Sequence, residues 1–312
     1  MKALEGKVAV VAGSARGAGR GIACMLGEAG ATVYCTARSA RGNLVTKKRP
    51  ETIDETAEMV TARGGVGIPV RVDHTVPEEV ERLFKRVKRE QRRLDLLVNN
   101  VNGDAMYQWK RSWDISLDVG LSILKAAIYS HIVNAHYAVP LMLETKRGLI
   151  VEITDGDGFY YRGNLYYDLT KTTAIRLAMD FSYELRKKKI AVVAITPGFL
   201  RSEVVLESLG VTEANWRDAV KKRPEFAESE TPFFVGRAVA SLAADARVMK
   251  KSGRVFNSAE LARQYGFTDV DGRSPKIWEW ISDSAFRYKK IDDEFYSYFD
   301  AGASPSSTGA RS

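Results

Sequence analysis

The sequence predicts an α/β fold in which a doubly wound parallel sheet is covered by helices on both faces. Short apolar runs alternate with amphipathic helical runs from residue 7 to residue 257, an order typical of a parallel sheet. The short runs are apolar at nearly every position, as strands are when both faces of a sheet are buried. The chain has 312 residues, 45% of them hydrophobic, which is enough apolar material for a full core.

Each predicted strand is a short run rich in Val, Ile, Leu or Ala. In chain order the predicted strands are Lys7–Ala12, Thr32–Ala37, Gly67–Val72, Leu94–Asn99, Leu149–Thr154, Ile190–Thr196 and Gly253–Asn257. Each predicted helix repeats apolar residues at helical spacing, as Val80, Leu83, Phe84 and Val87 do. In chain order the predicted helices are Gly19–Ala29, Glu51–Arg63, Glu78–Gln91, a long, mostly helical section ending near Leu143, Tyr167–Lys187 and Val235–Ala244.

The strands continue to Asn257, so we expect a single domain over residues 1–290. The small, polar residues 301–312 are expected to form a disordered tail. A basic insertion, Ser39–Thr52, follows the second strand, and no motif assigns it a role.

Composition restricts the class of protein. The net charge of +8 admits anionic partners, but its densest part is the polar face of the predicted helix Glu78–Gln91, which favours solvent over nucleic acid. No apolar stretch reaches about 18 residues, and no leader pattern follows Met1, so we expect a cytoplasmic protein without a membrane partner. Cys24 and Cys35 are too few for a disulfide framework. Three histidines without a Cys/His cluster indicate no metal site.

A glycine-rich turn joins the first strand to the first helix. It reads Gly13-Ser14-Ala15-Arg16-Gly17-Ala18-Gly19. Its three glycines let the backbone approach a ligand closely, and the helix that follows offers backbone N–H groups to a pyrophosphate. Between the first strand and the first helix of an alternating chain, this turn predicts a dinucleotide site.

The end of the second strand indicates which dinucleotide is preferred. The acid that would hold the ribose of NAD is absent, because Ala37 stands where it is expected and Arg38 and Ser39 follow. Arg38 and Arg16 can hold a 2′-phosphate by charge-assisted hydrogen bonds. The sequence therefore favours NADP(H), and NAD(H) is the less favoured cofactor.

Tyr167 and Lys171 form a candidate proton donor. They follow the predicted strand Leu149–Thr154, and their spacing of four puts both side chains on one face of a helix. A neighbouring ammonium stabilises the phenolate and lowers the pKa of a tyrosine. The spacing alone is common by chance, so the surrounding motifs carry the interpretation.

In this order, the motifs resemble the short-chain dehydrogenase/reductase family over about residues 5–257. The resemblance implies a Rossmann-type sheet, with Tyr167 and Lys171 as the catalytic pair. It also implies cofactor contacts along the carboxyl edge of the sheet. The implied cofactor residues are Gly13, Ser14, Ala15, Arg16, Gly17, Ala18, Gly19, Arg38, Ser39, Asp73, His74, Asn99, Asn100, Gly103, Tyr167, Lys171, Pro197 and Gly198.

Three of these motifs extend the resemblance beyond the glycine turn. Asp73 matches the acid that meets the adenine ring, and the run 99–103 resembles the family's Asn-Asn-Ala-Gly motif. Pro197-Gly198 matches the turn on the nicotinamide side, with Ser202 near the usual threonine. The runs 89–100, 197–203 and 265–272 resemble the subgroup around dehydrogenase/reductase member one and its bacterial relatives.

The sequence departs from the family pattern at two positions. The family's catalytic serine is replaced: counting back from Tyr167 indicates Thr154, whereas aligning the strand indicates Asp155. A threonine would keep a hydroxyl donor, whereas an ionised aspartate would raise the pKa of Tyr167. Near the family's helical asparagine stands Ala127, and no asparagine follows it before Asn134.

The resemblance implies an NADP(H)-dependent oxidoreductase that interconverts a small-molecule carbonyl and alcohol. A substrate lid is expected at about residues 201–232. The family also implies a homodimer or homotetramer, formed through the helical regions 117–143 and 167–187. A cofactor-binding protein with little or no catalysis stays open as the alternative, because Asp155 can have replaced the serine's function. A nucleic-acid-binding protein on a reductase scaffold is suggested only by the net charge, and no recognition module supports it.

Overall fold

The computed structural model describes residues 2–45, 49–103, 105–158 and 160–282, so the expected tail 301–312 lies outside the described residues. Seven parallel strands form one sheet in the order β3-β2-β1-β4-β5-β6-β7. The strands are β1 (Val8–Ala12), β2 (Thr32–Ala37), β3 (Val66–Arg71), β4 (Leu96–Asn99), β5 (Gly148–Ile153), β6 (Ile190–Thr196) and β7 (Val255–Asn257). This topology confirms the predicted doubly wound parallel sheet.

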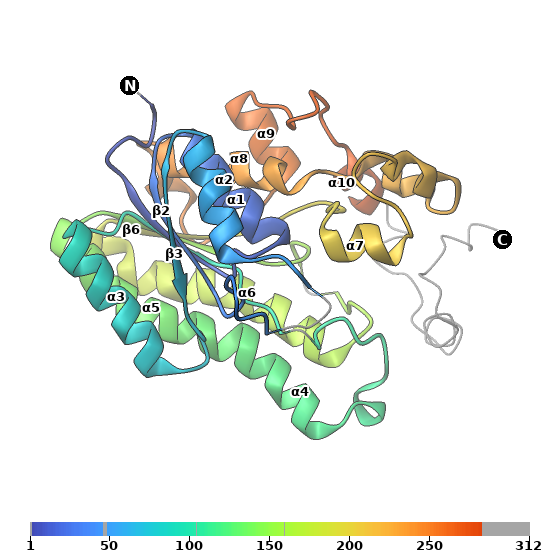
Figure 1. Cartoon of the computed structure of the whole chain (residues 1–312), viewed down its shortest axis with the longest axis horizontal. Coiled ribbons are helices and arrows are strands. Elements are labelled where there is room, and N and C mark those ends of the chain that lie inside the picture. The colour runs from blue at the N-terminus through green and yellow to red at the C-terminus, as the bar shows by residue number, and fades with distance from the viewer. Residues whose placement is uncertain (1, 46–48, 104, 159, 283–312) are drawn as a thin grey trace.

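Helices cover both faces of the sheet, with α1, α2 and α8 on one face and α3, α5 and α6 on the other (Figure 1). The helices are α1 (Gly17–Glu28), α2 (Ile53–Ala62), α3 (Pro77–Gln91), α4 (Leu117–Leu124), α5 (Ser130–Thr145), α6 (Leu165–Leu185), α7 (Glu203–Ser208), α8 (Pro232–Ala244), α9 (Ser258–Tyr265) and α10 (Ile277–Ser282). Two apolar cores result, one between each helical layer and the sheet. The central strands are buried on both faces, which explains their apolar sequences.

Two helices start earlier than predicted, because a capping side chain stands immediately before each of them. Asn164 accepts a hydrogen bond from Tyr167 N at 2.9 Å, so α6 begins at Leu165 rather than at Tyr167. Thr231 caps α8 in the same way, and that helix starts at Pro232 rather than at Val235. Among the strands, β3 is partly exposed and contains Pro69, which suits its position at the edge of the sheet.

The strand order reverses between β1 and β4, where the chain turns from one half of the sheet to the other. Loops that follow neighbouring parallel strands meet at the same edge, and ligands of such sheets bind at this point. The glycine turn after β1, the run 100–103 after β4 and the described residues 154–158 and 160–164 after β5 therefore lie along one edge. This edge positions the candidate site.

Candidate active site

The glycine turn packs so tightly against the loop after β4 that two of its glycines, Gly13 and Gly19, have no room for a side chain. A Cβ on Gly13 would lie 2.6 Å from the backbone oxygen of Asn100, and one on Gly19 would lie 2.1 Å from that of Gly13. Gly13 also has a φ of +80°, a conformation that favours glycine. Asn100 Nδ2 donates a 3.0 Å hydrogen bond to Gly13 O, which joins the two loops.

Positively charged side chains border this turn. Arg16 stands immediately before α1, and Arg38 follows the end of β2, the strand that pairs with β1. Ser39, beside Arg38, is buried, and its backbone oxygen accepts from Ile53 N. A glycine cradle at a helix amino end, flanked by two arginines, fits an anionic dinucleotide cofactor.

Behind this edge lies a continuous network of buried polar side chains. His74 bonds through one ring nitrogen to Thr36 Oγ1 at 2.8 Å and through the other to Asn134 Oδ1 at 2.7 Å. Asn134 donates to Asn99, and Asn99 donates to Glu152 at 2.8 Å. Burial lowers the pKa of His74 to about 4, so its imidazole is neutral near pH 7.

The far end of this network supports the loop that follows β4. Glu152 and His131, both buried, lie 2.7 Å apart, and the other ring nitrogen of His131 lies 3.2 Å from Val101 O. The imidazole of His74 and the amide of Asn99 therefore take part in interior contacts at this edge. Asp73 accepts hydrogen bonds from the backbone and hydroxyl of Thr75, which closes the turn after β3.

Tyr167 and Lys171 lie on one face of α6, as their spacing predicts. Lys171 Nζ donates a 3.1 Å hydrogen bond to Asn102 Oδ1 and lies 5.6 Å from the centre of the Tyr167 ring. Tyr107 and Trp109 pack beside the same ring, with centroids 5.9 and 5.4 Å from it. The lysine is thereby held between the tyrosine and the loop after β4.

Asp155, rather than Thr154, contacts the tyrosine. Tyr167 Oη donates a 2.5 Å hydrogen bond to Asp155 Oδ2. The Thr154 hydroxyl instead donates to the backbone oxygen of Lys171 at 2.7 Å and is buried. Successive side chains near the end of a strand point in opposite directions, so only one of the two can face Tyr167.

Arg162 holds the loop that carries Asp155. Its Nε donates to Asp155 O at 2.6 Å, and its Nη2 donates to Gly158 O at 2.9 Å. Its Nη1 forms an ion pair with Asp168, in the first turn of α6, at 2.7 Å. The guanidinium is almost fully buried, so it fixes the Asp155 backbone relative to the helix that carries Tyr167.

Burial and charge change the acidity of the central pair. Burial raises the pKa of Tyr167 well above its ordinary value, and the Asp155 carboxylate raises it further. Burial also lowers the pKa of Lys171 to about 8, although Asp155 opposes this effect. The tyrosine therefore keeps its proton over a wide pH range, while the lysine titrates close to neutrality.

The helical region after β4 contains a π-helical turn, Lys125–Tyr129, between α4 and α5. Ala127 lies in this turn and is buried. The next asparagine, Asn134, belongs to the buried network with His74 and not to the Tyr167 pair. Such single π turns are frequent at functional sites.

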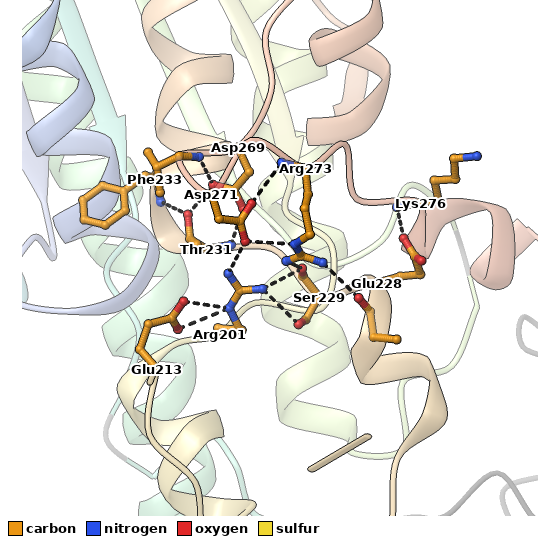
Figure 2. Close-up of polar contacts among 12 residues, drawn as sticks. Arg201, Glu213, Glu228, Ser229, Thr231, Phe233, Asp269, Asp271, Arg273 and Lys276 are labelled. Carbon is orange, nitrogen blue, oxygen red and sulfur yellow. Dashed lines mark hydrogen bonds and ion pairs between the residues drawn. The ribbon is translucent and has the colours of Figure 1, made fainter. Parts of the chain in front are cut away.

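The segment 201–232, where a lid is expected, has a small core of its own. Leu206, Trp216 and Phe226 pack against one another there. Arg201, with a fully buried side chain, forms ion pairs with Glu213 at 3.0 Å and Asp271 at 2.9 Å and donates to Ser229 O at 3.1 Å (Figure 2). This cluster joins the turn after β6 to the lid and to the segment before α10.

Comparison with known proteins shows the family. The family model for short chain dehydrogenases matches residues 7–209. The chain belongs to the short-chain dehydrogenase family. Dehydrogenase/reductase SDR family member 1 of Mus musculus is 35% identical over 279 residues, which cover 88% of this chain and 86% of that protein. The predicted resemblance to this subgroup is confirmed.

A more distant relative and a solved structure also match. The 7alpha-hydroxysteroid dehydrogenase of Clostridium sardiniense is 30% identical over 210 residues, covering 67% of this chain and 76% of that enzyme. The crystal structure of a putative dehydrogenase from Xanthomonas campestris superposes with a TM-score of 0.73 at 20% identity, over 89% of this chain and 96% of that one. That structure supports the fold.

Several site residues of this short-chain dehydrogenase were not singled out from the sequence. Arg162 carried one weak signal, a lone arginine in a glycine-rich loop before Asp168. Asn102 lies within a recognised motif to which the sequence assigns no partner.

Among the described residues, no helix combines the length and apolar content needed to cross a membrane. Within the same residues, no group of three or more His, Cys, Asp or Glu is arranged to hold a metal ion.

Proposed function

We propose that the protein is an NADP(H)-dependent oxidoreductase that interconverts a carbonyl and an alcohol, with Tyr167 as the acid/base. The observation that carries this proposal is the arrangement of Tyr167, Lys171 and Asp155 at the edge that bears the glycine cradle. The Tyr167 hydroxyl donates to the Asp155 carboxylate there, and the Lys171 ammonium beside them donates to Asn102. These are the groups that carbonyl reduction and alcohol oxidation need.

Each residue has a separate task in the proposed reaction. The nicotinamide cofactor, when bound, supplies the hydride chemistry. Tyr167 gives its hydroxyl proton to the carbonyl oxygen in reduction and takes it back in oxidation. The Lys171 ammonium stabilises the phenolate that Tyr167 then becomes. The Asp155 carboxyl orients the Tyr167 hydroxyl and occupies the place of the family's serine, beside the substrate oxygen.

The pKa of Lys171 predicts the pH range of reduction. Tyr167 stays protonated above its ordinary range, so the Lys171 ammonium, with a pKa of about 8, is the first of the two to lose its proton as the pH rises. We expect kcat/KM for reduction to fall above about pH 8. A Lys171→Arg variant, whose guanidinium stays charged, should keep its activity to higher pH. Identical alkaline limbs in both proteins would contradict this role.

Arg38 is proposed to set the preference for NADP(H). Replacing Arg38 by alanine removes a charge-assisted hydrogen bond to the 2′-phosphate, so the Kd for NADPH should rise by roughly 10- to 100-fold while that for NADH stays constant. Titration of cofactor fluorescence measures both constants. Arg41→Ala is the matched control, since Arg41 is exposed and pairs with Glu58 at 2.7 Å. Equal weakening of NADPH and NADH would argue against a phosphate contact.

The function itself is tested by a substrate screen. The full chain is incubated with NADPH or NADH and a panel of ketones, aldehydes and quinones, and with NADP⁺ or NAD⁺ and the matching alcohols. Change in nicotinamide absorbance at a rate above the substrate-free control is expected with NADP(H). Because a homologue is named as a 7alpha-hydroxysteroid dehydrogenase, hydroxysteroids belong in the alcohol panel.

A second candidate function is a cofactor-binding protein with little or no catalysis. The hydrogen bond from Tyr167 to Asp155 favours it, because the only hydroxyl proton of the tyrosine is directed at a carboxylate instead of a substrate. Tight NADPH binding without turnover across the whole panel would support this candidate over the oxidoreductase.

We also propose a homodimer or homotetramer, formed through the region of α4, α5 and α6. Large apolar side chains are exposed there, namely Leu117, Leu121, Ile132, Leu165, Leu169, Met179 and Tyr183. Exposed apolar surface of this kind commonly marks a contact between subunits. The proposed substrate is a small molecule, with no nucleic-acid or membrane partner, and the proposed location is the cytoplasm.

A further inference from the structure

The amino end of α1 binds a carboxylate from a distant part of the chain. Gly17 N, at the start of α1, donates a 2.8 Å hydrogen bond to Glu203 Oε2, 186 positions later. Glu203 Oε1 lies 3.9 Å from Nη1 of Arg20. The first turn of α1 contains no acidic residue, and Arg16 makes no side-chain cap. Glu203 therefore supplies the negative charge at this helix end.

The same helix end belongs to the glycine cradle that fits a dinucleotide. Backbone N–H groups at a helix amino terminus bind carboxylates and phosphates by the same hydrogen bonds and the same dipole. The start of α7 is packed close to this cradle, because a Cβ built on Gly17 would lie 3.6 Å from Ser202 Cβ. A pyrophosphate and the Glu203 carboxylate therefore require the same donors.

A second carboxylate on α7 contacts the cofactor-binding half of the chain. Glu207, one helical turn after Glu203, forms an ion pair with Arg49, in the basic insertion before α2. Residues four apart lie on one face of a helix. One face of α7 thus presents two acids, one to the start of α1 and the other to Arg49.

Helix α7 is anchored to the rest of the segment 201–232. At its start, the buried Arg201 side chain forms ion pairs with Glu213 and Asp271 (Figure 2). Leu206, on α7 itself, is buried in one core with Trp216 and Phe226. Displacement of the α7 carboxylates from Gly17 and Arg49 would therefore shift this core together with the helix.

We propose that Glu203 competes with the cofactor pyrophosphate for the amino end of α1, so that α7 is an acidic strap which the dinucleotide displaces. This inference rests on the proposed NADP(H) function. The Glu203 carboxylate and a pyrophosphate are both negative, so they repel each other where they compete for the same backbone donors. The strap therefore weakens cofactor binding and links it to the position of the lid. Glu203 is a regulatory residue of the cofactor site and not part of the reacting group.

The first test measures cofactor affinity. Glu203→Gln keeps the size of the side chain and removes its charge, so the Kd for NADPH should fall by about tenfold. Glu184→Gln removes the same charge from an exposed position on α6 and should leave the Kd unchanged. A Kd for Glu203→Gln that is unchanged or higher overturns the inference while leaving the proposed function intact. Failure of the parent protein to bind NADPH or NADH would refute both.

The second test needs no cofactor. Hydrogen exchange of the peptide covering residues 203–208 reports how firmly α7 is held. Exchange should be faster in Glu203→Gln and in Glu203→Ala than in the parent protein and in Glu184→Gln. Equal exchange in all four proteins would show that the Gly17 contact does not hold the strap, and would overturn the inference.

Discussion

Replacement of Tyr167 by phenylalanine is expected to lower kcat by a factor of about 10²–10⁴ while NADPH binding is retained. The variant keeps the ring that packs between Tyr107 and Trp109 and removes only the hydroxyl. The variant therefore loses the hydroxyl that donates to Asp155 and that the proposed reaction uses as its proton donor. Steady-state kinetics on the best substrate of the screen, with NADPH fluorescence titration, measures both quantities.

The neighbouring tyrosine offers a matched control. Tyr166 is also buried, and its ring packs against Gly120 in the same helical region. Tyr166→Phe removes an identical hydroxyl from the adjacent position and should leave kcat within about twofold, since surface or core changes that remove no reacting group act mainly on stability. Full turnover in Tyr167→Phe would refute the proposed acid/base.

Replacement of Asp155 by alanine is expected to have two separable effects. The plateau of kcat should fall by about 10²-fold, because the carboxyl that orients the Tyr167 hydroxyl at 2.5 Å is lost. The inflection in the pH profile of kcat that reports the ionisation of Tyr167 should move to lower pH. Its pKa is raised by burial and by Asp155, and the variant removes the second cause. A full pH profile of kcat in both directions measures both effects.

Asp155→Ser separates orientation from charge. A serine restores a hydroxyl donor without a negative charge, so the plateau should recover in part while the Tyr167 inflection stays at the lower pH. Asp180→Ala, which removes an exposed aspartate further along α6, is the control for the charge alone. An unchanged plateau in Asp155→Ala would mean that Asp155 does not act on the reacting atoms. A Tyr167 inflection that stays at the same pH in Asp155→Ala would mean that the Asp155 charge does not act on Tyr167.

Local patterns were enough to predict the layered fold and the family. The strands are apolar because both faces of the sheet are covered, so their positions could be read from residues alone. Glycines 13 and 19 are required by close backbone approach, which leaves a mark in the sequence. Helix starts were less predictable, because α6 and α8 begin where Asn164 and Thr231 cap them.

The partners of the polar side chains could not be predicted in the same way. Both ring nitrogens of His74 bond to Thr36 and Asn134 in the interior, partners that no spacing in the sequence indicates, and the cofactor contact of His74 stays a prediction. Arg162 donates to backbone oxygens of the irregular loop after β5, where no residue spacing indicates which groups come together. A hydrogen bond depends on direction as well as distance, and direction is set by packing from several elements at once.

Residue patterns suffice to predict the doubly wound sheet, the glycine cradle and the pairing of Tyr167 with Lys171, because each follows from the spacing of residues within one element or one turn. Two contacts follow only from packing: Asp155 rather than Thr154 faces Tyr167, and Glu203 reaches Gly17. The orientation of Asp155 toward Tyr167 depends on the direction that the chain takes after the last hydrogen bond that pairs β5 with its neighbouring strand. The second contact joins residues 186 positions apart, and such a contact exists only once the segment that carries Glu203 has packed against the start of α1.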